Sequence, residues 1–209
     1  VHPEIAPMLG YLMGNLHGST HGRSAPWSKV GTWRKENRGY ILDHIAKAME
    51  RYCSKSTLGE FIASARNAPQ SLTWTDPIHR NMFVKPNGVV QCIDFDAMQT
   101  FDPAYDLGLI TAHWKWMELK GLVAVRTDAR KFLKNFFTNY QKQLLAYRIS
   151  SKVKKRLSIA RIAGWGFILC IALIMQWTDF FRATYSGMRE CGKKGFDYFW
   201  KNKITANWP

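Results

Sequence analysis

The chain has 209 residues, 46% hydrophobic and 14% aromatic, a composition that excludes an intrinsically disordered protein and predicts one folded domain over residues 1–209. Its formal net charge of +15 favours anionic partners, such as nucleotides, nucleic acid, an acidic protein or a membrane surface, without choosing among them. The four cysteines have no C-x-x-C spacing, which argues against a zinc site and a disulfide framework and indicates a reducing, cytoplasmic compartment.

The first part of the chain is expected to be helical, with one loop. Apolar residues three and four positions apart predict an amphipathic helix over residues 5–17. Gly18 and Gly22 suggest that this helix ends there, before a Gly/Ser/Pro-rich loop. Periodicity predicts two further helices, over 38–53 and 57–66.

A hairpin is predicted in the middle of the chain. The β-prone runs NMFV and VVQCIDF are separated by KPNG, and Asn-Gly between two such runs is the strongest short-range hairpin signal. Beyond it, helical patterns continue almost to the end, over residues 104–119, 126–147, 151–181 (with a break) and 192–202. The expected fold is therefore mainly α, with one small hairpin inserted.

One apolar run tests whether the chain enters a membrane. Residues 162–175 are apolar throughout, but a bilayer span needs about 20 such residues. We therefore expect a buried core helix here, with an interfacial or membrane role as the alternative.

Carboxylates gather in one segment of this basic chain. Five of its fifteen acidic residues lie between Asp76 and Asp106. A hairpin brings its strand ends together, so Asn81 and Asp94 are expected near one point. Amide and carboxylate oxygens are ligands that Mg²⁺ accepts when nucleotide phosphates supply the rest. Asp76 would then be available to accept a proton from a hydroxyl nucleophile.

These motifs resemble those of the aminoglycoside phosphotransferase and choline kinase family. The family pattern is H-x-D-x-x-x-x-N, a hairpin, I-D-F/W-[ED], and then D-P-x-x-D-L. Asp76 to Asn81 has the right interval, IDFD matches at 93–96, and DPAYDL follows at 102–107. LMGNLHGSTH resembles the helix that opens the large lobe of these enzymes, and FLKNFFTNYQKQL resembles a later helix.

The resemblance implies the large helical lobe of a protein-kinase-like fold, with the hairpin beside the active loop. It implies an ATP- and Mg²⁺-dependent phosphotransferase acting on a hydroxyl of a small molecule or peptide. The nucleotide lobe would come from another chain or from upstream sequence, because nothing in these residues supplies it. A protein partner that supplies this lobe is therefore expected.

The resemblance also implies a role for each site residue. Asp76 would be the catalytic base, with Asn81 and Asp94 as Mg²⁺ ligands. Asp96 is a further candidate for a metal or phosphate contact, and so are His79 and Arg80, which depart from the family's usual residues; the alternative for His79 is a hydrogen-bonded loop histidine. Structural support of the loop would come from Trp74, Asp102 and Asp106. Trp74 stands where the family pattern has His, and a Trp offers a single N–H donor to hold the loop.

Several alternatives remain open. The chain could be a non-catalytic kinase-like subunit that binds a partner protein or peptide through a basic helical face. The basic stretch at 148–161 also permits nucleic-acid or membrane binding, although no recognisable motif accompanies it. His17 and His21 have metal-ligand spacing, but no third ligand or nearby carboxylate is apparent.

Overall fold

The computed structural model describes residues 5–21, 54–68, 70–119, 126–147 and Trp165. The predicted helices at 38–53, 151–181 and 192–202 and the basic stretch at 148–161 lie outside the described residues, Trp165 excepted. The described helices are α1 (Ala6–Thr20), α3 (Lys55–Arg66), α4 (Ala104–Leu119) and α5 (Arg126–Ala146). The four helices predicted for these regions are therefore confirmed.

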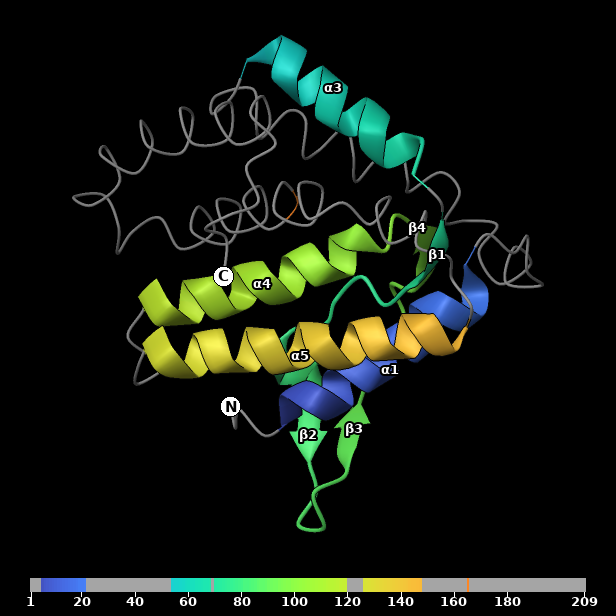
Figure 1. Ribbon diagram of the computed structural model, residues 1–209. Coiled ribbons are helices and arrows are strands. Elements are labelled where there is room, and N and C mark those ends of the chain that lie inside the picture. Colours follow the sequence, from blue (N-terminus) through green and yellow to red (C-terminus); the bar gives the residue numbers. More distant parts are fainter. Residues whose placement is uncertain (1–4, 22–53, 69, 120–125, 148–164, 166–209) are drawn as a thin grey trace.

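Helices α1, α5 and α4 form the body of the fold. Helix α5 packs along α1 on one side and contacts α4 on the other (Figure 1). Three glycines of α1 allow the close approach to α5. A Cβ at Gly10 would overlap the carbonyl oxygen of Phe136, and one at Gly14 would lie 2.6 Å from the Cβ of Gln143.

Helix α1 is longer than the sequence predicted. It continues through Gly18 to Thr20, so the expected end at Gly18 is wrong. Gly18 lies against Tyr147, which directly follows α5, and an added Cβ would come within 2.6 Å of the ring. This glycine therefore serves close helix packing and does not break the helix.

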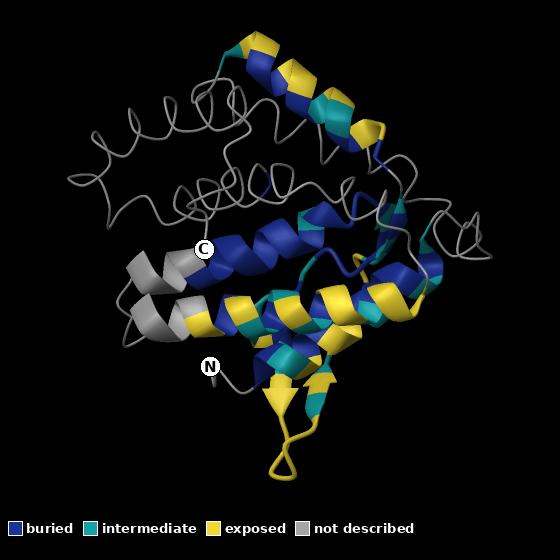
Figure 2. Cartoon of the chain, viewed as in Figure 1, coloured by how far each residue is buried: buried dark blue, intermediate teal, exposed yellow. Residues whose placement is uncertain are grey.

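Helix α4 lies at the centre of the core. All of its residues from Ala104 to Trp114 are buried except Tyr105, which is half-buried (Figure 2). Apolar residues predominate around this helix, as expected of one in the interior, and the buried polar residues among them are Asp106, Thr111 and His113. Aromatic contacts join α4 to its neighbours: Trp114 stacks on Phe132 of α5 at 3.9 Å, and Tyr105 meets Trp165 edge-on at 5.2 Å.

Two separate pairs of antiparallel strands complete the described fold. Strand β2 (Met82–Val84) pairs with β3 (Val90–Cys92), with Met82 opposite Cys92. Gly88, at φ 79°, lies in the turn between them, which confirms the predicted hairpin. Figure 1 shows this hairpin projecting from the body beyond α1, and most of its side chains are exposed (Figure 2).

The second pair was not predicted. Strand β1 (Ser71–Thr73) pairs with β4 (Gln99–Phe101), with Ser71 opposite Phe101. Each strand has only three residues, which is too short for an alternating pattern to stand out. Thr20 at the end of α1 fixes this pair, because its hydroxyl accepts a hydrogen bond from the backbone N–H of Leu72 at 2.9 Å.

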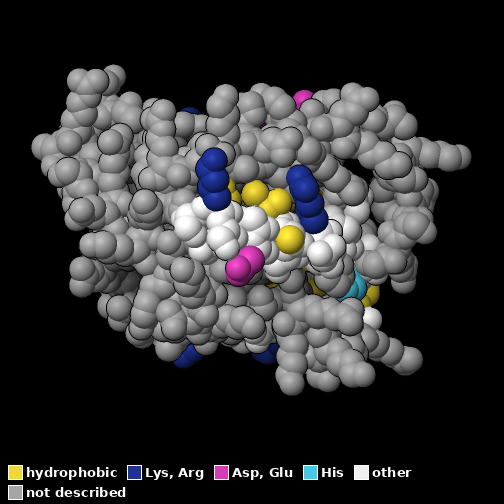
Figure 3. All heavy atoms as spheres, turned by 90° about the horizontal axis from the view of Figure 1, so that it is seen from above, with side chains coloured by type: hydrophobic (Ala, Val, Ile, Leu, Met, Phe, Trp, Pro, Cys, Tyr) yellow, Lys and Arg dark blue, Asp and Glu magenta, His cyan; other side chains and the backbone are white. Residues whose placement is uncertain are grey.

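Helix α3 is capped at its start by Ser54, whose hydroxyl accepts a hydrogen bond from the Thr57 N–H at 3.2 Å. Figure 3 looks onto this side of the molecule and shows basic and acidic side chains on the described surface. The exposed residues of α3 include Lys55, Glu60 and Arg66, so its outer face is mixed in charge. Among the described residues no helix is long and apolar enough to cross a membrane.

Candidate active site

The two strand pairs hold two loops against each other. One loop, residues 74–81, leads from β1 through a 3₁₀ turn (η3, His79–Asn81) into the hairpin. The other, residues 93–98, leads from the hairpin to β4. Their ends are tied together because the N–H of Ile93 donates to the carbonyl oxygen of Asn81 at 3.0 Å. Asp94 therefore lies one residue beyond the residue that pairs with Asn81.

Asp76 is half-buried in the first loop. Its Oδ2 accepts a hydrogen bond from the Asn81 Nδ2 at 2.9 Å, and its carbonyl oxygen accepts a second from the same nitrogen at 3.0 Å. Burial raises the pKa of Asp76 above its ordinary value, although the bond from Asn81 lowers it. The charges of Asp94 and Asp106 raise the pKa further. This carboxylate accepts a proton more readily than an exposed one does.

Trp74 joins the two loops. Its indole is 1% exposed, and its Nε1–H donates to the carbonyl oxygen of Asp94 at 2.9 Å. Its ring also lies 5.3 Å from that of Phe95. The single N–H donor of this side chain is thus used to hold the backbone of Asp94.

Both loops contain strained backbone. Thr75 has φ 70° and Asp94 has φ 60°, the two positive values among the described residues other than glycine. For a β-branched residue such as Thr75 this conformation is unusual, and it persists only where the surroundings enforce it. The Thr75 hydroxyl is within hydrogen-bonding distance of the carbonyl oxygens of Trp74 (2.6 Å) and Ala97 (2.7 Å).

Asp106 on α4 holds the backbone just before Asp76. Its Oδ2 accepts from the N–H of Trp74 at 2.7 Å, and its Oδ1 accepts from the N–H of Thr75 at 2.8 Å. The carboxylate is fully buried and lies in the first turn of α4, where the helix dipole favours a negative charge. The Nε2 of His17 contacts the same Oδ2 at 3.1 Å.

Asp102, also fully buried, lies just before α4. Its Oδ1 accepts from the N–H of Ala104 at 3.0 Å, as a residue that caps a helix does. Its Oδ2 accepts from the indole N–H of Trp165 at 3.2 Å. Asp102 therefore links the start of α4 to a tryptophan from later in the chain.

Asn81 and Asp94 supply oxygen atoms of the kind that Mg²⁺ takes. The Nδ2 of Asn81 is directed at Asp76, which leaves the amide oxygen as its acceptor atom. The Asp94 side chain is exposed, and so are those of Asp96 and Arg80. Hard oxygen donors beside solvent fit a magnesium ion whose remaining ligands are waters and phosphates. The described residues hold no group of three or more His, Cys, Asp or Glu side chains suited to a metal.

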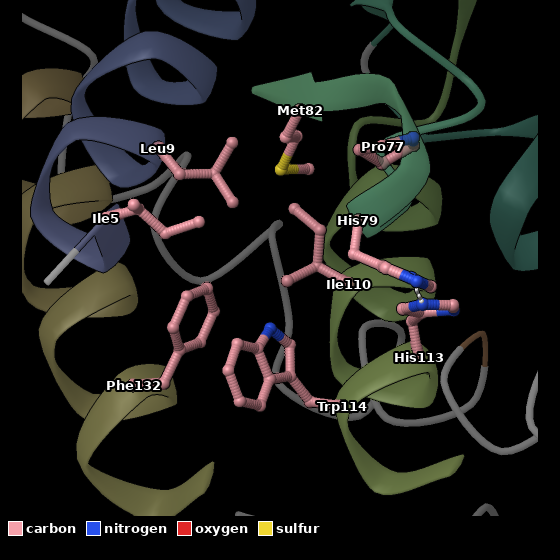
Figure 4. Close-up of a pocket in the computed structure, with 9 residues that line it drawn as sticks. All are labelled: Ile5, Leu9, Pro77, His79, Met82, Ile110, His113, Trp114 and Phe132. Carbon is pink, nitrogen blue, oxygen red and sulfur yellow. Dashed lines mark hydrogen bonds between the residues drawn. The ribbon is translucent and has the colours of Figure 1, made fainter. Parts of the chain in front are cut away.

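His79 faces α4. Its Nδ1 is hydrogen-bonded to the Nε2 of His113, and the two rings stack with centroids 4.6 Å apart (Figure 4). Both rings line a small pocket of about 10 Å³ whose other walls are apolar, formed by Ile5, Leu9, Pro77, Met82, Ile110, Trp114 and Phe132. Burial, together with the charges of His79 and Arg80, lowers the pKa of His113 to about 4.

Three side chains near this site had no assigned role in the sequence. His113 lies within an apolar helical stretch, and Tyr140 lies in a predicted helix between the polar runs Thr138-Asn139 and Gln141-Lys142. His17 was considered only as a metal ligand with His21, with no carboxylate nearby. In the fold His17 contacts Asp106, 89 residues away in the chain, and His21 contacts the Ser71 hydroxyl at 3.1 Å. For His17, the sequence signal was the resemblance of LMGNLHGSTH to the helix that opens the large lobe of the family.

Comparison with known proteins gives one family. The phosphotransferase enzyme family, APH, matches residues 2–141, which include α1, both strand pairs and α4. Neither the curated proteins nor the solved structures give a significant match. The matched segment contains both loops and covers more than half of the chain. The chain therefore belongs to the APH phosphotransferase family.

Proposed function

We propose that this protein transfers a phosphoryl group from ATP to a hydroxyl of a small molecule or peptide, with Mg²⁺ as cofactor. The observation that carries the proposal is the placement of Asp76. It is a half-buried carboxylate with a raised pKa, bonded to the Asn81 amide, on a loop tied to Asp94. Membership of the phosphotransferase family supports the reaction class.

Asp76 would accept the proton of the acceptor hydroxyl and orient it for attack. A base works best when its pKa lies close to the operating pH, and burial shifts Asp76 in that direction. The Asn81 amide would hold the Asp76 carboxylate in place through its bond at 2.9 Å. Catalysis of this kind depends mainly on positioning and on electrostatic stabilisation.

Asn81 and Asp94 would hold Mg²⁺ through their side-chain oxygens. The bound ion neutralises charge on the transferring phosphoryl group. Asp96, Arg80 and His79 are proposed as further metal or phosphate contacts, and Asp96 and Arg80 are both exposed on the loops. Trp74, Asp102 and Asp106 would provide structural support for the loop at residues 74–81.

The nucleotide lobe would be supplied by another chain or by upstream sequence. This part of the proposal extends the family resemblance. If another chain supplies it, a partner protein that carries such a lobe would be required for full activity. The rival reading is a non-catalytic kinase-like subunit that keeps the fold and binds a partner.

The test is Mg²⁺-dependent ATP binding by calorimetry, followed by phosphoryl transfer to a panel of hydroxyl acceptors. Both are measured on the chain alone and with any partner that co-purifies. Asp94→Ala should abolish Mg²⁺-dependent ATP binding, and Asp76→Asn should keep binding and lose turnover. Glu60→Gln is the control, because it removes an exposed carboxylate on α3. Equal binding and turnover in parent, Asp94→Ala and Asp76→Asn would refute the proposal.

A further inference from the structure

A row of buried side chains connects three helices to the backbone just before Asp76. On α5, the Tyr140 hydroxyl lies 2.9 Å from the Nδ1 of His17 on α1. The Nε2 of His17 then lies 3.1 Å from the Oδ2 of Asp106 on α4. Tyr140, His17 and Asp106 are 2%, 1% and 0% exposed. Asp106 in turn accepts the backbone N–H groups of residues 74 and 75.

The Asp106 carboxylate at the end of this row determines which atoms donate and which accept. An ionised carboxylate only accepts, so the His17 Nε2 must carry a hydrogen and donate it to Asp106. In the neutral ring Nδ1 is then an acceptor, and the Tyr140 hydroxyl donates to it. The Tyr140 hydroxyl therefore favours the one imidazole tautomer that can donate to Asp106.

His17 also restricts the orientation of the Asp106 carboxylate. Oδ2 contacts both the His17 ring and the N–H of Trp74, and this leaves Oδ1 for the N–H of Thr75. Thr75 is the residue held at φ 70°, and Asp76 follows it directly. A carboxylate free to rotate would hold these two N–H groups less well, and the strained backbone would relax.

We propose that His17 and Tyr140 are positioning residues for the active loop. They orient Asp106 so that it holds Trp74 and Thr75 in the conformation that presents Asp76. The catalytic part of this inference rests on the proposed function of Asp76. The structural part, that Tyr140 controls the order of residues 74–75, stands apart from that function.

The test compares Tyr140 of α5 with Tyr147, which directly follows α5. The Tyr147 hydroxyl also bonds to an α1 side chain, the Asn15 Oδ1 at 2.7 Å, but not to the His17–Asp106 row. Tyr140→Phe and Tyr147→Phe therefore each remove one hydroxyl that contacts an α1 side chain, a buried one at Tyr140 and an exposed one at Tyr147. Hydrogen exchange of the Trp74 and Thr75 amides is measured on the full chain, with Mg²⁺-dependent ATP turnover as the second readout.

The expected result is faster exchange at Trp74 and Thr75 in Tyr140→Phe only. Its kcat should fall about tenfold with an unchanged KM for ATP, since the loss of one buried hydrogen bond has about this size. His17→Gln should keep more protection than His17→Leu, because the glutamine amide can still donate to Asp106. Equal exchange in the two tyrosine variants would overturn the proposal.

The outcomes separate this proposal from the proposed function. A parent protein without ATP turnover, both alone and with any partner that co-purifies, would contradict the phosphotransferase proposal. The exchange data would still decide whether Tyr140 orders residues 74–75. A parent with turnover, and a Tyr140→Phe variant with unchanged kcat, would overturn the positioning role alone.

Discussion

Replacing a glycine by alanine should have opposite effects on the free energy of unfolding in α1 and in α3. Gly→Ala in a helix interior gains about 1 kcal/mol of helix propensity. At Gly59 of α3 an added Cβ meets nothing within 4 Å, so this gain should be retained. Gly59→Ala should therefore raise the free energy of unfolding by roughly 0.5–1 kcal/mol.

At Gly10 the added Cβ meets backbone atoms. It would overlap the carbonyl oxygen of Phe136 and lie 3.0 Å from the backbone nitrogen of Tyr140. Since these atoms belong to α5 itself, α1 and α5 must move apart, and overpacking of this kind costs about 1–3 kcal/mol. Gly10→Ala should lower the free energy of unfolding despite its better propensity. Gly18→Ala should cost less, because it meets only the ring of Tyr147.

The assay is urea unfolding followed by circular dichroism at 222 nm, with the parent and the three variants under one set of conditions. Midpoints are compared at constant slope, so that a shift reports stability alone. The reasoning predicts the order Gly59→Ala, parent, Gly18→Ala, Gly10→Ala, from most to least stable. A Gly10→Ala variant as stable as Gly59→Ala would show that the contact between α1 and α5 is not as close as described.

Three further predictions concern Asp76, Trp74 and His113. Asp76→Asn should lower kcat by roughly 10²–10⁴-fold, the range for loss of a general base. Because burial raises the pKa of Asp76, the ionised group destabilises the fold above that pKa, so the variant should unfold at higher urea than the parent at pH 7 but not at pH 3. Trp74→Phe keeps the ring but loses the bond to Asp94, and should cost about 1 kcal/mol of stability and weaken Mg²⁺-dependent ATP binding; unchanged binding in calorimetry would count against this. The pKa of His113 falls from 6.5 to about 4 on folding, so the imidazole gains a proton in the unfolded chain before it does in the fold. As the pH falls from 7 to 4, this difference should lower the free energy of unfolding of the parent by about 3 kcal/mol. His113→Gln should show a correspondingly smaller loss in urea titrations at the two pH values, and an identical loss would contradict the assignment.

Local sequence predicted the elements whose signals lie within a few residues. Asn87-Gly88 marked the hairpin, and apolar spacing marked the four described helices. Strands β1 and β4 were missed because three-residue strands carry no pattern of their own. Gly18 was misread because a glycine that ends a helix and one that lets two helices approach look the same in sequence.

The interval between Asp76 and Asn81 could be read from the sequence, but the contacts that hold their loop in place could not. Asp106 meets His17 across 89 residues and Trp74 across 32, and no local spacing encodes such pairs. The indole N–H of Trp74 was recognised as a possible donor, yet its acceptor is a backbone carbonyl. A carbonyl oxygen is present in every residue, so its selection depends on the fold alone.

The five carboxylates between Asp76 and Asp106 differ in how far they are buried. Asp102 and Asp106 are fully buried and accept hydrogen bonds from nearby N–H groups. Asp94 and Asp96 are exposed, where a carboxylate stays hydrated until a cation displaces its water. Asp76 is half-buried, and its raised pKa reflects that intermediate position. A buried charge is tolerated only when it is bonded, so the first two acids are committed to the protein and the exposed pair is available to ligands. A basic chain can therefore gather acids in one segment without one role for all of them, because the fold gives each carboxylate a different environment.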